Sequence, residues 1–176
     1  MRSLILGGAR SGKSALAERI AAGCGDDVVY IATARPGEAG DAEMAGRIAH
    51  HRARRPSAWG CIEEPLALAA TLAAHDRPGR CLLVDCLTLW LSNLLLDADA
   101  GRFERERAAL FDTLSSLQGE VVLVGNEVGM GVVPLGELSR RFVDENGRLH
   151  QQLAAGCERV VLVAAGLPLA LKGELP

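Results

Sequence analysis

Eight residues near the start of the chain have the types and spacing that bind phosphate. The segment Gly7-Gly8-Ala9-Arg10-Ser11-Gly12-Lys13-Ser14 fits the phosphate-binding loop pattern G-x-x-x-x-G-K-[ST]. In that pattern, glycines let backbone N–H groups converge on phosphate oxygens. Lys13 then reaches the β- and γ-phosphates, and the Ser14 hydroxyl binds Mg²⁺. The motif predicts that the chain binds a nucleoside triphosphate; an ordinary glycine-rich turn is the alternative.

An acidic residue at the end of another predicted strand fits the same nucleotide-binding chemistry. The apolar run 81–84 reads as a buried strand, and Asp85 closes it. A carboxylate at such a strand end holds the Mg²⁺ of the bound nucleotide, directly or through water. Asp85 can also cap the helix that follows, and the two roles are compatible. Asp26 and Asp27 precede a strand instead of ending one, so they are poorly placed for the metal.

The segment 47–56 is unusually basic for a chain of net charge −3, and it contains two of the four histidines and four arginines. A solvated basic helix end would explain it, because cations complement the helix dipole there. A zinc site is disfavoured, since adjacent histidines on a helix point in different directions. Nucleophilic attack on phosphorus is the functional interpretation: neighbouring arginines favour neutral imidazole and stabilise phosphoryl oxygens. Spacing alone does not choose between His50 and His51.

The elements that must position these groups alternate along the chain. Predicted strands are 3–6, 28–32, 59–63, 81–85, 120–124 and 159–164, and predicted helices are 15–22, 41–54, 66–75, 87–96, 102–117 and 135–155. This alternation predicts an α/β doubly wound, mostly parallel sheet flanked by helices, with residues 1–176 as one domain. Ligands of such sheets bind beyond the carboxyl ends of the strands, so the loop 35–40 should border the site.

Composition limits the other possibilities. The hydrophobic fraction is 49% and the charged fraction 23%, as in globular proteins, and the net charge gives no pull toward nucleic acid or membrane surfaces. The sequence has no apolar run of about 18 residues, so we expect no membrane span. The N-terminus does not read as a signal peptide. Five cysteines without C-x-x-C spacing are typical of reduced core residues, which predicts a cytoplasmic protein.

Taken together, the motifs make the chain resemble the bifunctional adenosylcobinamide kinase/adenosylcobinamide-phosphate guanylyltransferases of cobalamin biosynthesis. The resemblance covers nearly the whole chain, through residues 7–14, 30–34, 47–52 with 55–56 and 59, 83–88 with 93–95, 126–134 and 165–169. It implies a P-loop, RecA-like fold and a homo-oligomer, commonly a trimer. It also implies two reactions. ATP or GTP phosphorylates the aminopropanol hydroxyl of the corrinoid adenosylcobinamide, and GTP then supplies GMP to give adenosylcobinamide-GDP.

The resemblance also implies roles for single residues. His50 falls on the histidine that forms the covalent GMP intermediate. Nucleotide-contacting positions fall on the phosphate loop 7–14 and on Thr33, Ala34, Arg35, His51, Arg52, Ala53, Arg54, Glu63 and Asp85.

Some alternatives stay open at this point. A plain P-loop kinase would use the basic segment only to clamp its substrate, and a non-enzymatic nucleotide switch would transfer nothing. The stretch 126–131 is either a structural turn or a ligand-approaching loop in which Glu127 steers a hydroxyl or a metal. The corrin ring is too large for one small domain to enclose, which favours a pocket shared between subunits.

Overall fold

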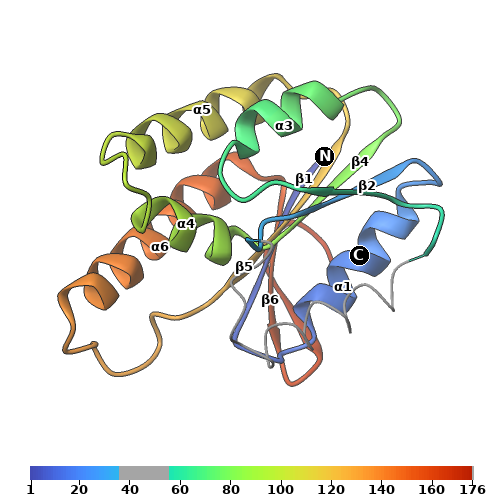
Figure 1. Cartoon of the computed structure of the whole chain (residues 1–176). Helices are drawn as coiled ribbons and strands as arrows, with labels where there is room; N and C mark the ends of the chain where they lie inside the picture. Colours follow the sequence, from blue (N-terminus) through green and yellow to red (C-terminus); the bar gives the residue numbers. More distant parts are fainter. Residues whose placement is uncertain (36–55, 176) are drawn as a thin grey trace.

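The computed structural model describes residues 1–35 and 56–175, which form alternating strands and helices (Figure 1). The strands are β1 (Arg2–Gly7), β2 (Val28–Ala32), β3 (Gly60–Glu63), β4 (Cys81–Asp85), β5 (Glu120–Asn126), β6 (Arg159–Ala164) and β7 (Leu167–Lys172). The helices are α1 (Lys13–Gly23), α3 (Leu68–His75), α4 (Leu87–Leu95), α5 (Arg102–Ser116) and α6 (Glu137–Gly156). The predicted helix 41–54 lies outside the described residues.

Within the described ranges, seven strands form one sheet in the order β3-β2-β4-β5-β1-β6-β7. All neighbouring pairs are parallel except β6 and β7, which run antiparallel. The central strands β1, β4 and β5 are buried almost throughout, which explains why their sequences are continuous apolar runs instead of alternating ones. The predicted α/β fold with a mostly parallel sheet is confirmed.

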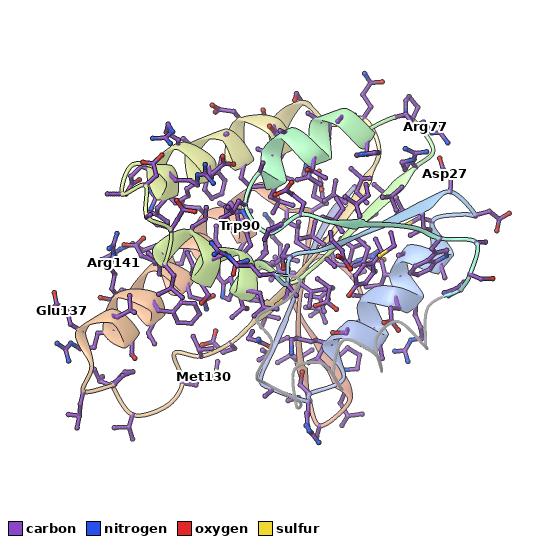
Figure 2. All side chains as sticks on the ribbon, viewed as in Figure 1. Asp27, Arg77, Trp90, Met130, Glu137 and Arg141 are labelled. Atoms are coloured by element: carbon purple, nitrogen blue, oxygen red, sulfur yellow. The ribbon has the colours of Figure 1, made fainter. Side chains whose placement is uncertain are left out.

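Helices cover both faces of the sheet (Figure 1). Alternate strand residues face opposite sides, so Leu82 and Leu123 pack with Trp90 under α3, α4, α5 and α6. Leu83 and Val122 belong to the other core, which α1 covers. Trp90 is fully buried between the sheet and the helices (Figure 2), and its indole N–H donates to Leu66 O at 2.8 Å. Packing in these two cores fixes the positions of the strand ends relative to one another.

The hairpin strand β7 is absent from the sequence-based prediction. It follows a turn at Ala165 and Gly166, whose φ angles are 51° and 79°. Its leucines Leu167, Leu169 and Leu171 are exposed, because β7 is an edge strand with little of the sheet's cover. A short edge strand that contains a proline lacks the continuous apolar run that marks the central strands.

Helix α3 begins two residues later than the predicted helix 66–75. The Oε1 atom of Glu64 accepts hydrogen bonds from the backbone N–H groups of Leu66 and Ala67 at 2.8 and 2.7 Å. This carboxylate therefore pairs with the N–H groups of the two residues directly before α3, which are held in a turn outside the helix.

Candidate functional site

The predicted phosphate loop connects the end of β1 to the start of α1. Helix α1 begins at Lys13, and Gly12 caps it with a φ of 97°. That left-handed conformation favours glycine, which explains this position of the motif. The N-terminus of α1 contributes N–H groups and a partial positive charge to the loop. Strand, glycine-rich turn and helix are therefore arranged as anion binding requires.

Two other strands hold this loop from outside. The Gly166 N–H of the β6–β7 turn donates to Ser11 O at 2.8 Å, and the Glu127 N–H after β5 donates to Gly7 O at 3.0 Å. A Cβ on Gly12 would lie 3.2 Å from the Gly166 Cα. The β6–β7 turn thus packs directly against the phosphate loop, and no local feature of residues 7–14 could have indicated it.

Lys13 lies inside the loop instead of in solvent. Its side chain is buried, and its ammonium donates to Gly8 O at 3.1 Å. Ser14, the next residue, is half-buried in the first turn of α1. A lysine held at the loop backbone is positioned for a phosphate that the same backbone binds.

Asp85 ends β4, as the sequence predicted, and it is half-buried beside Cys86. The pKa of the Cys86 thiol is raised to about 11, mainly by burial; the Asp85 charge contributes to this rise, and the Lys13 charge opposes it. Since both charges act on one thiol, Lys13 and Asp85 share a neighbourhood. Strand β5 alone separates the Asp85 strand from β1, so the carboxylate and the phosphate loop open at the same sheet edge.

The donor set at this edge fits magnesium bound with a nucleotide. Among residues 1–35 and 56–175, no three His, Cys, Asp or Glu side chains gather where they could hold a metal alone. Mg²⁺ in nucleotide sites takes few protein ligands and completes its shell with phosphates and water. One hydroxyl from Ser14 and one carboxylate from Asp85 match that requirement.

The segment after β2 is fastened to both ends of α4. The Thr33 hydroxyl donates to Cys86 O at 2.6 Å and accepts from the Cys86 N–H at 3.0 Å, with the side chain fully buried. The Asn93 Nδ2 donates to Thr33 O at 2.8 Å. Arg35 donates to Asn93 O at 3.2 Å and lies 3.7 Å from Asp97. The described contacts of 33–35 therefore fix the segment that leads out of β2.

Asn93 was not predicted as part of the site. It lies in an amphipathic helix, where sequence periodicity gives a polar residue no special weight. Its Nδ2 bridges Thr33 O and Pro65 O, at 2.8 and 3.1 Å, and so joins the segments after β2 and β3.

Glu63 ends the edge strand β3 and is exposed. Its register partner is Ala32, and Ala32 in turn pairs with Asp85. Three neighbouring strands therefore end at one level, with Glu63 and Asp85 on either side of β2. Gly7 ends β1 at the same edge, opposite Asn126 of β5.

The stretch after β5 lies next to the phosphate loop. The Asn126 N–H donates to the Thr88 hydroxyl at 2.7 Å, and Asn146 of α6 donates to Asn126 O at 3.1 Å. Glu127 Oε1 accepts from the Gly129 N–H at 2.6 Å, which closes a tight turn. The Glu127 backbone, one residue beyond the register partner of Gly7, therefore contacts the first residue of the phosphate loop.

The basic segment with His50, His51, Arg52, Ala53 and Arg54 lies outside the described residues. Its neighbours in the chain are described: Arg35 follows β2, and Pro56 precedes β3. Because β2 ends at the edge where the phosphate loop opens, the chain leaves the sheet there toward this segment.

Comparison with known proteins gives a consistent result. Residues 3–171 match the family model described as cobinamide kinase / cobinamide phosphate guanyltransferase. The bifunctional adenosylcobalamin biosynthesis protein CobP of Pseudomonas aeruginosa is 65% identical over 174 residues, covering 99% of both chains. The bifunctional adenosylcobalamin biosynthesis protein CobU of Escherichia coli is 40% identical, covering 98% of this chain and all of the relative.

A solved structure from Pyrococcus horikoshii OT3 shares the fold. Its TM-score is 0.53 over 98% of this chain and 86% of that chain, at 9% sequence identity. At that identity the likeness shows the fold alone. The family match over most of the chain and the full-length relatives together establish the family: the chain belongs to the cobinamide kinase / cobinamide phosphate guanyltransferase family.

Proposed function

We propose that this chain phosphorylates adenosylcobinamide and then attaches GMP to the new phosphate, with both nucleotides bound at the sheet edge described above. The observation that carries the proposal is a phosphate loop whose lysine is bound at the loop backbone, at the same sheet edge as the carboxylate that ends β4, in a chain of this family. The printed names of the full-length relatives, bifunctional adenosylcobalamin biosynthesis proteins, support two activities.

In the kinase step, the aminopropanol hydroxyl oxygen attacks the γ-phosphorus of ATP or GTP. The bond from that phosphorus to the β–γ bridging oxygen breaks, and the nucleoside diphosphate leaves. Lys13 and the loop N–H groups stabilise charge on the phosphoryl oxygens. Glu127 lies beside Gly7 at this edge, and we assign it the proton of the attacking hydroxyl.

We assign Mg²⁺ to Ser14 and Asp85. When bound, it neutralises charge on the phosphate oxygens and helps align them for in-line transfer. Thr33 supports this assignment: its hydroxyl holds both the N–H and the C=O of Cys86, so it fixes the backbone beside Asp85.

In the guanylyl step, a neutral His50 nitrogen attacks the α-phosphorus of GTP. The α–β bond breaks, pyrophosphate leaves, and GMP stays on His50 as a phosphoramidate. A phosphate oxygen of adenosylcobinamide phosphate then attacks the same phosphorus, the N–P bond breaks, and His50 is regenerated. We assign the remaining nucleotide contacts to the loop 7–14 and to Thr33, Ala34, Arg35, His51, Arg52, Ala53, Arg54, Glu63 and Asp85.

The test is covalent labelling with α-³²P-GTP followed by denaturation. We expect acid-labile label on the wild-type chain and on His51→Ala, and none on His50→Ala. A plain kinase would take no label, and a nucleotide switch would neither take label nor transfer phosphate. Equal labelling of His50→Ala would move the nucleophile to another residue.

We also propose that the enzyme is a homo-oligomer, a trimer by resemblance, that acts in the cytoplasm. Large apolar side chains after β5 support the oligomer, since Met130, Val132, Val133 and Leu135 are at least 72% exposed. Met130 lies on the loop that leads from β5 toward α6 (Figure 2). The described residues contain no disulfide bond, as a reducing compartment predicts. Light scattering after size exclusion measures the assembly.

In the described part of the chain, no helix has the length and apolar character needed to cross a membrane.

A further inference from the structure

Helix α6 buries two polar side chains one turn apart against the end of β5. Asn146 is 1% exposed and His150 is 6% exposed. Asn146 Nδ2 donates to Asn126 O, whereas its Oδ1 and both imidazole nitrogens of His150 have no hydrogen-bond partner among the described residues. A buried polar group without a partner is costly, so a fully buried imidazole at this position needs an explanation beyond packing.

The backbone of β5 is shaped around this imidazole. A Cβ on Gly125 would lie 2.6 Å from His150 Nε2 and 3.2 Å from Leu6 Cδ2. Only glycine therefore leaves room for the ring at this distance. The ring sits directly behind the strand end whose next residues, Asn126 and Glu127, border the phosphate loop.

The Glu127 carboxylate is close enough for its charge to act on His150. Burial lowers the pKa of His150, and the Glu127 charge opposes that shift. The ring is therefore neutral near pH 7, with one N–H donor and one acceptor nitrogen. Glu127 Oε1 accepts from the Gly129 N–H at 2.6 Å, and neither imidazole nitrogen of His150 has a hydrogen-bond partner among the described residues.

We propose that His150 is a positioning residue for Glu127: its imidazole N–H donates to the Glu127 carboxylate when Glu127 turns toward the acceptor hydroxyl of the kinase step. The donation leaves the second carboxylate oxygen aimed at the hydroxyl and gives the buried imidazole its missing partner. Asn146 holds the backbone of the same strand end through Asn126 O. This inference rests on the proposed kinase function and extends it to His150, which lies 23 positions after Glu127 in the chain.

The first test compares His150→Leu with His150→Gln in the full chain. Leucine has a similar volume and no donor, whereas glutamine restores an N–H. We expect His150→Leu to lower kcat for phosphate transfer to adenosylcobinamide by about 10- to 100-fold. KM for the nucleotide and the rate of GMP transfer from GTP to adenosylcobinamide phosphate should change less than about threefold, because neither uses Glu127. His150→Gln should recover most of the lost kcat.

The second test measures coupling. Glu127→Gln lowers kinase kcat by removing the carboxylate, and adding His150→Leu to it should cost no more than about twofold further. Multiplicative losses would overturn the inference, and so would an equal loss of GMP transfer in His150→Leu, which would show a purely structural role. If His150→Leu does not fold, Gly125→Ala replaces it, since the added Cβ displaces the intact ring.

The wild-type chain separates this inference from the function on which it rests. A wild-type chain without kinase activity refutes the proposed function. A wild-type chain with kinase activity that His150→Leu retains in full refutes only the role of His150.

Discussion

Gly7 and Gly8 are adjacent glycines of the phosphate loop that are needed for different reasons. A Cβ on Gly7 would lie 2.5 Å from Ser11 Oγ and 2.5 Å from the backbone oxygen of Val163, whereas a Cβ on Gly8 would meet nothing within 4 Å. Neither glycine has a positive φ. Replacing each by alanine therefore isolates the effect of the close contact, because both changes reduce the entropy of the unfolded chain equally.

The size of the effect follows from the distances. Heavy atoms are in best contact at roughly 3.5–4.0 Å, so the new methyl in Gly7→Ala is about 1 Å too close to each oxygen. Ser11 can rotate its hydroxyl away, but the Val163 oxygen belongs to strand β6 and cannot. Overpacking of this kind costs about 1–3 kcal/mol of unfolding free energy. For a chain of 176 residues this lowers Tm by about 2–12 °C.

Thermal denaturation followed by circular dichroism measures this difference. Gly8→Ala is the matched control and should melt within about 2 °C of the wild type, as exposed substitutions usually do. If Gly7→Ala and Gly8→Ala had the same melting temperature, whether unchanged or equally lowered, the close contact with β6 would contribute no difference in unfolding free energy. The idea that β6 shapes the loop would then fail.

Four further predictions concern other residues of the chain. Thr33→Val should lower the unfolding free energy, measured by urea titration, by about 1–3 kcal/mol, because the Cys86 N–H loses its acceptor. Thr33→Ser keeps the hydroxyl and loses only a methyl group, so it should lower the unfolding free energy by about 0.8 kcal/mol. Asp85→Asn should raise the Mg²⁺ needed for half-maximal kinase rate at least about tenfold. Cys61 should react with a thiol reagent at once, and Cys157 only after unfolding. Mainly through burial, the pKa values of Cys86 and Cys157 are raised from 9.0 to about 11. The contribution of these neutral thiols to the free energy of unfolding should therefore be fully present below pH 9 and should be lost as the pH rises toward 11.

The sequence predicted the elements that have strong local signals. The phosphate loop, the apolar run ending at Asp85 and the alternation of strands with helices all follow from residue types within short windows. The order of the strands does not. That β5 lies between β1 and the Asp85 strand depends on crossover connections, and no local pattern encodes them. This order is what brings Glu127 beside Gly7.

Some long-range contacts around the site were equally hidden. The resemblance implied a nucleotide contact for Thr33, but no local pattern predicts that its hydroxyl reaches the Cys86 backbone or that the Asn93 amide reaches Thr33 O. His150 reads as a polar residue of an amphipathic helix. Its burial against Gly125 appears only when α6 packs on β5.

The phosphate loop therefore depends on the far end of the chain for its shape. Its Ser11 carbonyl is held by Gly166 and its Gly7 carbonyl by Glu127, more than 100 residues away. The eight-residue motif indicates a phosphate ligand, because it supplies the N–H groups and the lysine. The conformation in which those groups converge comes from β5, β6 and the β6–β7 turn. Residues 126–134 and 165–169 thus have a structural reason to accompany the loop motif, since each provides one of its two backbone anchors.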